Sequence, residues 1–150
     1  MIEVVKFLSD PMGENAYIFF LEGEKRAVAV DPSYNAQAML NYLKEEETQL
    51  EAILLTHGHF DHIAGVDVLR GATGAPVYIH EADAQMLEDP EKNLSVITHQ
   101  LFTIKPADRL LKGQEVLELA GMQVQVLHTP GHTQGGVCYL AEDVLFSGDT

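Results

Sequence analysis

The motif T-H-G-H-F-D-H, Thr56 to His62, sets three imidazoles and one carboxylate within six consecutive positions, 57–62. Imidazole and carboxylate groups are common ligands of protein-bound metals. The preceding segment 52–56 is a short apolar run of the kind found in buried strands, and apolar residues recur at helical spacing over 63–70. The sequence therefore predicts a metal-binding motif at a turn between a strand and a helix.

The spacing within the motif would allow one short segment to serve two metal ions. In extended backbone, residues two apart point to the same side, so His57 and His59 can face one ion. Asp61 and His62 are adjacent, and where the chain turns into the helix their side chains can diverge towards a second ion. The alternative is a histidine-rich polar loop without a metal, but the density of ligands favours a metal site.

Composition and charge restrict the class of protein. The chain has 150 residues, 46% of them hydrophobic and 21% charged, which fits a single globular domain over 1–150. It contains no apolar run long enough to span a membrane, the amino terminus lacks a signal-peptide layout, and Cys138 has no partner for an internal disulfide, so we expect a cytoplasmic protein. The net charge of −14 argues against a nucleic-acid partner.

The amino-terminal half shows the pattern of an α/β protein. Three strands are predicted at 2–8, 16–21 and 26–30. Asn35 is expected to cap a helix whose buried stripe is Ala36, Met39, Leu40 and Leu43. A further strand at 75–79 follows the histidine motif and its helix, which completes a βαβ-like unit.

The carboxy-terminal half is predicted to be rich in strands. A short helix is expected at 81–87 and an irregular loop at 89–99, within which His99 receives no role. Hydrophobicity then alternates with a period of two. The predicted strands are 114–119, 123–127, 136–140 and 143–146.

The remaining histidines differ in their suitability as metal ligands. Pro130 and Gly131 force a sharp turn that can direct His132 away from its strand, so His132 is the better candidate. His128 lies within a strand and is expected to be packed and hydrogen-bonded. His80 lies at a strand end and is expected either on the surface or in contact with a metal ligand, without binding the metal itself. After the last strand, Gly148 lets the backbone come close, and a carboxylate at Asp149 can bridge two ions.

Three motifs in this order, T-H-G-H-F-D-H, H-T-P-G-H-T at 128–133 and S-G-D-T at 147–150, each at a strand end, together with V-D-P at 30–32, resemble the metallo-β-lactamase superfamily. Within it, the chain is most similar to the small hydroxyacylglutathione hydrolase (glyoxalase II) type. The resemblance implies a mixed α/β fold, a four-layer αβ/βα sandwich. The family has further strands, a last helix and another metal-binding histidine after G-D-T, so we expect a domain incomplete at its carboxyl end.

The resemblance also implies ligand roles. His57, His59 and His132 would hold the first metal, Asp61 and His62 the second, and Asp149 would bridge them. Asp31 would orient a ligand imidazole from behind. Two Zn²⁺ ions are expected, although Fe or Mn also suit imidazole and carboxylate ligands.

These ligands predict an enzyme that needs no serine or cysteine nucleophile. Metal-bound hydroxide, oriented by Asp61, would attack a small acyl thioester whose thiolate leaves readily. A mononuclear iron persulfide dioxygenase with two His and one Asp as ligands is one alternative, and a lactonase is another. If Thr150 is the true terminus, a metal-binding domain without catalysis is the third.

Overall fold

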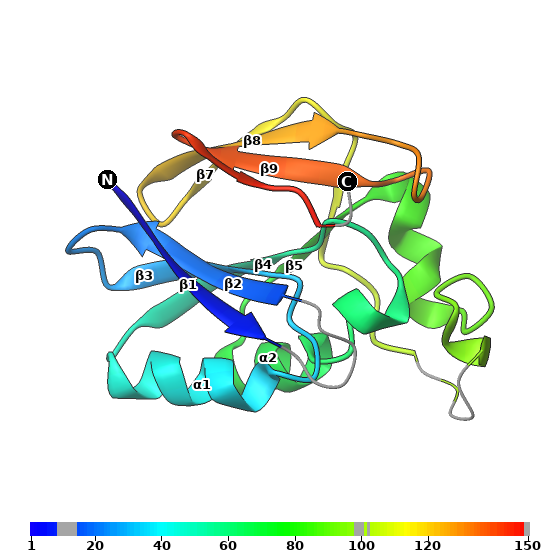
Figure 1. Ribbon diagram of the computed structural model, residues 1–150, viewed down its shortest axis with the longest axis horizontal. Helices are drawn as coiled ribbons and strands as arrows, with labels where there is room; N and C mark the ends of the chain where they lie inside the picture. Colours follow the sequence, from blue (N-terminus) through cyan, green and yellow to red (C-terminus); the bar gives the residue numbers. More distant parts are fainter. Residues whose placement is uncertain (9–14, 98–100, 102, 149–150) are drawn as a thin grey trace.

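The computed structural model describes residues 1–8, 15–97, 101 and 103–148, which are arranged in three layers. Figure 1 shows the helices α1 (Ala36–Glu45) and α2 (Val66–Thr73) below a first sheet, with a second sheet stacked above it. No described helix covers the outer face of the second sheet. The described residues therefore build a mixed α/β sandwich with three of the four expected layers.

The first sheet contains the amino-terminal strands in sequence order. Its described strands are β1 (Ile2–Leu8), β2 (Asn15–Leu21), β3 (Arg26–Val30), β4 (Gln49–Leu54), β5 (Val77–His80) and β6 (Arg109–Leu111). The first three pair in antiparallel fashion, whereas β3 to β6 are parallel. This arrangement confirms the predicted βαβ unit, because α2 connects the parallel neighbours β4 and β5.

The strand β6 was not predicted from the sequence. It is three residues long, and Arg109 and Leu110 are exposed, so its hydrophobic pattern is weak. It is held by parallel pairing with β5, from Tyr78 opposite Arg109 to His80 opposite Leu111. The long-range partner, and not the local sequence, decides that this segment is a strand of the first sheet.

The second sheet contains the carboxy-terminal strands and is antiparallel throughout. Its described strands are β7 (Val116–Leu119), β8 (Met122–His128), β9 (Val137–Ala141) and β10 (Val144–Phe146), with β10 and β7 at the two edges. All four correspond to predicted strands. In β8, Met122, Val124 and Val126 are buried, and the residues between them point outwards.

The first sheet is covered on both faces, so its central strands contribute to two cores. Ala27 and Ala29 of β3 pack with α1 and α2, where Met39 and Leu69 are fully buried. Val28 and Val30, on the opposite side of the same strand, pack against the second sheet. Burial on both faces explains why β3 and β4 are nearly continuous apolar runs.

The start of α1 differs from the prediction. Asn35 occupies the N-cap position, but its side chain makes no capping hydrogen bond. Instead its Oδ1 accepts from the backbone N–H of Ser33 at 3.0 Å, and its Nδ2 donates to the carbonyl of Phe7 at 2.9 Å. A tertiary contact with β1 has therefore replaced the local cap.

The short helical segments are of the 3₁₀ type. They are η1 (Phe60–His62), η2 (Glu81–Glu88) and η3 (Ser95–Ile97). The segment η2 matches the predicted short helix, whereas η3 lies in the stretch expected to be irregular. None of the helices in the described parts of the chain is long and apolar enough to cross a lipid bilayer.

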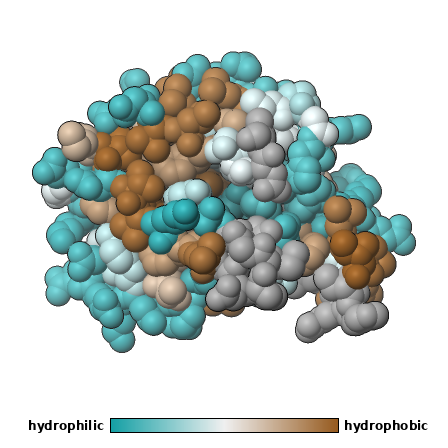
Figure 2. Space-filling view, in the orientation of Figure 1, coloured by the Kyte–Doolittle hydropathy of each residue, from teal (hydrophilic) through white to brown (hydrophobic). Residues whose placement is uncertain are grey.

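Apolar side chains gather at one side of the molecule, over the edge strands β1 and β10, as the brown atoms in Figure 2 show. Val4 and Leu145 are exposed there. A cavity of about 430 Å³ lies at the same side, lined in part by Ile2, Leu21 and Leu140. This region is separate from the histidine motif.

Candidate metal centre

The histidine motif begins where β4 ends. Residues 56–59 form a loop, Phe60–His62 form η1, and α2 starts at Val66, three residues later than the predicted start. The neighbouring parallel strand β3 ends at Val30, so Asp31 leaves the sheet at the same edge. Because parallel strands present their carboxyl ends together, these two chain segments meet at one site.

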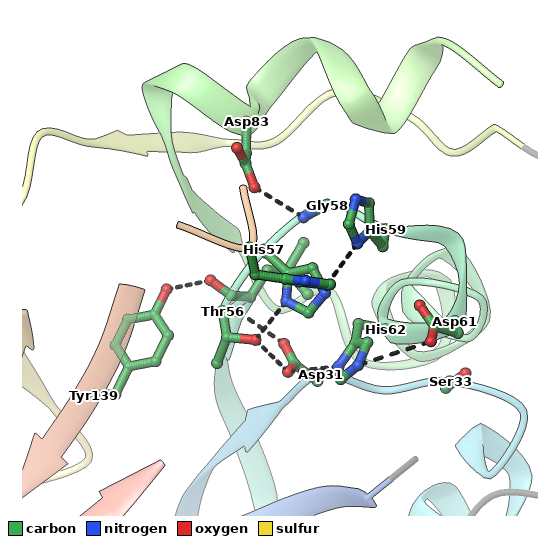
Figure 3. Close-up of polar contacts among 12 residues, drawn as sticks. Asp31, Ser33, Thr56, His57, Gly58, His59, Asp61, His62, Asp83 and Tyr139 are labelled. Carbon is green, nitrogen blue, oxygen red and sulfur yellow. Dashed lines mark hydrogen bonds and ion pairs between the residues drawn. The ribbon is translucent and has the colours of Figure 1, made fainter. Parts of the chain in front are cut away.

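A buried group of polar side chains lies at the base of the site: Asp31, Thr56, His57 and His62, each at most 3% exposed. Asp31 is its centre, as Figure 3 shows. Its Oδ1 accepts from the backbone N–H of Thr56 at 2.8 Å, and its Oδ2 accepts from the Thr56 hydroxyl at 2.5 Å and from Nδ1 of His62 at 3.0 Å. A single carboxylate therefore ties β3 to the histidine motif.

These contacts set the tautomers of two imidazoles. An ionised carboxylate only accepts, so His62 carries its proton on Nδ1. The Thr56 hydroxyl donates to Asp31 and so accepts from Nδ1 of His57, 3.1 Å away. Both rings are thereby oriented with the lone pair on Nε2, the atom that can bind a metal ion. Asp31 therefore contacts the His62 ring at the nitrogen opposite Nε2, and its role as an orienting residue stays a prediction.

A second group, His59 and His132, is more open to solvent. His132 lies in the loop between β8 and β9, 73 positions along the chain from His59, yet His59 Nδ1 and His132 Nε2 are 2.9 Å apart. The loop is closed by hydrogen bonds from Gly131 N to Thr133 O at 3.0 Å and from Thr129 N to Gly136 O at 2.8 Å. The turn at Pro130 and Gly131 thus directs His132 away from its strand, and the fold places it beside His59 of the histidine motif.

The two groups give overlapping sets of possible metal ligands. His57, His59 and His132 form one set, and Asp31, His57 and His62 form the other, with ligand atoms in each within 4.8 Å of one another. Burial lowers the pKa of His57 to about 3, and burial followed by the neighbouring His132 lowers the pKa of His59. Neutral imidazoles are the form that binds metals, so three nitrogen donors suit a Zn²⁺ or Fe ion.

The two carboxylates expected at the second ion are placed differently. Asp61 lies on η1, is largely buried, and its Oδ2 is 4.0 Å from Nε2 of His62. Asp149 lies outside the described residues. Gly148 lies directly against Thr56, because a Cβ added there would be 2.4 Å from the Thr56 hydroxyl, and its φ is +59°. The chain therefore reaches the site immediately before Asp149, and glycine permits that approach.

The structure does not place His80 and His128 among the metal-ligand groups. Their rings stack with centroids 4.2 Å apart at an angle of 14°. His80 is buried, its Nδ1 accepts from Ala82 N at 3.0 Å, and its Nε2 donates to Lys112 O at 3.1 Å. His128 donates from Nε2 to Gln134 O at 2.9 Å, which agrees with the packed, hydrogen-bonded role expected for it. His99 lies outside the described residues.

Two residues that contact the site were not predicted from the sequence. Asp83 on η2 is 1% exposed and contacts both ligand-bearing loops, including Gly58 N at 3.1 Å. Tyr139 of β9 is fully buried and donates its hydroxyl to Leu55 O at 2.6 Å, just before the histidine motif. Neither has a local sequence signal, because Asp83 looks like a solvated acid in a polar helix and Tyr139 like an ordinary strand residue.

Comparison with known proteins agrees with this architecture. A family model described as the metallo-beta-lactamase superfamily matches residues 11–150. The probable metallo-hydrolase YqgX of Bacillus subtilis (strain 168) is 37% identical over 142 residues, which cover 93% of this chain and 66% of the relative. The chain thus spans about two thirds of the length of the curated relatives named here and of similar ones.

Two solved structures share both the fold and part of the sequence. The crystal structure of BLEG-1 B3 metallo-beta-lactamase superposes with a TM-score of 0.91 at 40% identity, covering 98% of this chain and 72% of that chain. The crystal structure of TTHA1623 in a di-iron-bound form gives a TM-score of 0.75 at 33% identity, covering 97% of this chain and 71% of that one. With the ordered motifs and the two stacked sheets, these matches show that the chain belongs to the metallo-β-lactamase superfamily.

Proposed function

We propose that this chain forms the metal-binding part of a hydrolase that cleaves small acyl thioesters, in the manner of the glyoxalase II type. The observation that carries the proposal is the convergence of His57, His59 and His132, from two distant segments, with the oriented His62 beside them. The relative YqgX is named a probable metallo-hydrolase, which supports hydrolysis. The thioester itself is inferred from the chemistry of its leaving group.

The expected division of labour combines the first ligand set with the roles that the family resemblance implies for the second ion. His57, His59 and His132 would hold one ion, and His62 with Asp61 a second. A divalent metal lowers the pKa of water to about 7 and polarises a carbonyl, so it supplies a nucleophile and an electrophile at neutral pH. Asp61, largely buried on η1, would orient the attacking oxygen and accept its proton. A thioester suits this site because the thiolate is a good leaving group and needs little help from a general acid.

An open cavity beside the exposed ligands can receive the substrate. Its volume is about 260 Å³, and it lies between η2 and the loop that carries His132. His59 and His132 form the side nearest the candidate metal centre, Met86 gives an apolar surface, and Lys92 brings a positive charge. The cavity would hold the thiol portion of the substrate, with the scissile carbonyl directed towards the imidazoles.

The test combines metal content with activity. Elemental analysis of the purified protein should find zinc, near two ions per chain, and thiol release from S-2-hydroxyacyl thiols should require the metal. Asp61→Ala should lower the rate of thiol release by about 10²-fold or more, the usual size of a lost proton-transfer group. Asp143→Ala, which alters an exposed carboxylate between β9 and β10, is the matched control. Unchanged thioesterase activity in Asp61→Ala would refute the role given to Asp61.

Two other reactions are tested with the same material. BLEG-1, at 40% identity, is described as a B3 metallo-beta-lactamase, so hydrolysis of a chromogenic cephalosporin should be measured beside that of the thioester. One iron per chain with thiol-dependent O₂ uptake would favour the persulfide dioxygenase. Turnover of the cephalosporin or uptake of O₂ without thioester cleavage would replace the proposed function.

A further inference from the structure

We propose that Asp83 is a positioning residue that sets the distance between the two loops carrying His59 and His132, and thereby the affinity for the first metal ion. The inference rests on the metal centre of the proposed function but not on its substrate. Asp83 lies on η2, outside both ligand groups, and its role is to hold their backbones. No ligand atom of Asp83 is assigned to the metal.

The contacts of Asp83 join two segments that are far apart in sequence. Its Oδ2 accepts from Gly58 N at 3.1 Å and from the Thr133 hydroxyl at 2.7 Å, and its Oδ1 accepts from Gly135 N at 2.8 Å. Gly58 lies between His57 and His59, and Thr133 follows His132. Figure 3 shows Asp83 directed at the histidine loop from the side opposite Asp31. In each loop, the Asp83 carboxylate therefore contacts a residue that is adjacent in sequence to a candidate ligand.

The shape of the loop that carries His132 fits this role. A Cβ added at Gly135 would be 2.7 Å from both the backbone nitrogen and Oδ1 of Asp83, so the loop lies flat against the first turn of η2. Glycine is required there because any side chain would move the loop away. The hydrogen bonds of Asp83 and the absence of a side chain at Gly135 thus specify the same separation.

The segment that carries Asp83 is itself fixed. His80, immediately before η2, uses both ring nitrogens, one for Ala82 N and the other for Lys112 O. Its ring stacks on His128, which donates to Gln134 O in the loop that also contains Thr133 and Gly135. His80 and His128, which the structure does not place among the metal ligands, therefore anchor η2 to the loop that carries His132.

Removal of the carboxylate should affect the metal more than the fold. Without it, the N–H groups of Gly58 and Gly135 lose a buried acceptor, and the loops can move apart to reach water. His59 and His132, whose nitrogens are 2.9 Å apart, would then no longer share one ion in their present geometry. Residues that orient metal ligands typically change metal affinity by about 10- to 100-fold when mutated.

The experiment compares Asp83→Asn and Asp83→Ala with Asp108→Asn. Asp108 also accepts a backbone N–H, from Val77 at 2.8 Å, but lies away from the histidines, so it controls for a carboxylate that merely holds backbone. The dissociation constant for Zn²⁺ is measured by competition with a chromogenic chelator, and the visible spectrum of the Co²⁺-substituted protein reports ligand geometry. We expect both Asp83 variants to bind Zn²⁺ about 10- to 100-fold more weakly and to show an altered Co²⁺ spectrum. Asp108→Asn should change neither.

Unchanged Zn²⁺ affinity and an unchanged Co²⁺ spectrum in Asp83→Asn would overturn the proposal. If both Asp83 variants fail to fold, Thr133→Ala, which removes one donor and keeps the carboxylate, must still weaken Zn²⁺ binding, and unaltered binding there would also overturn it. No readout uses turnover. A protein that shows the Asp83 effect but hydrolyses no thioester would therefore contradict the proposed function and leave this inference standing.

Discussion

The two groups of candidate ligands are built in different ways. The buried group around Asp31 is attached directly to the ends of β3 and β4, and its side chains are at most 3% exposed. His59 and His132 lie on loops, where His59 is half-buried and His132 is exposed, and Asp83 on η2 holds the backbones of these loops. The buried group is therefore part of the folding core, whereas the exposed group is an addition to it.

This difference predicts a separation between stability and metal binding. Hydrogen bonds through Asp31 and Thr56 hold the side chains of the buried group together without a metal, so their loss should destabilise the protein itself. The exposed group contributes few contacts to the fold, so its loss should chiefly weaken metal binding. Four tests distinguish the two groups by the free energy of unfolding of the metal-free protein, with the largest expected change for Asp31→Ala and the smallest for His132→Ala.

The largest change is expected for Asp31→Ala. The substitution leaves the Thr56 N–H and the His62 ring without their buried acceptor, and loss of one member of a buried charged network typically costs about 3–5 kcal/mol. Urea denaturation of metal-free protein measures the difference. A loss below about 1 kcal/mol would show that the buried group is not part of the folding core.

The second test is the pH dependence of stability. The pKa of His57 is about 3 in the folded protein and near 6.5 when unfolded, so below pH 6.5 the unfolded state takes up a proton that the folded state does not. Stability should therefore fall as the pH drops from about 6.5 towards 3, by at most about 1.4 kcal/mol per pH unit for this group. Denaturation of metal-free protein at pH 7, 6 and 5 measures the slope, and His57→Gln should reduce it.

Tyr139→Phe tests the support of the buried group from the second sheet. The hydroxyl donates to Leu55 O, one residue before Thr56, and its removal leaves that buried carbonyl without this donor. We expect a loss of about 1–2 kcal/mol in urea denaturation, with Zn²⁺ affinity nearly unchanged. A larger effect on the metal than on stability would show that β9 positions the ligands.

The smallest change in stability is expected for His132→Ala. His132 is exposed and lies in a loop, so the free energy of unfolding of metal-free protein should fall by at most about 1 kcal/mol. The same substitution removes a nitrogen from the first ligand set, so the Zn²⁺ dissociation constant should rise by at least 10-fold. A large loss of stability without a loss of metal affinity would contradict the contrast between the two groups.

Local sequence determined much of the site and of the fold. The motif at 56–62 lies at a strand end as predicted, because a buried apolar run and a following polar turn are encoded within a few residues. The strands β1 to β5 and the hairpins of the second sheet follow from period and turn chemistry in the same way. The turn that directs His132 away from its strand was also predictable, since Pro130 and Gly131 turn the chain at a fixed place.

Only the tertiary structure decided the features that depend on distant partners. β6 is a strand because β5 pairs with it, and Asn35 does not cap α1 because Phe7 offers a carbonyl. Asp83 and Tyr139 act through backbone groups of other segments, and a backbone N–H or C=O carries no side-chain signature in the sequence. The residue types fixed which groups can bind a metal, and the packing of the two sheets and η2 fixed where those groups meet.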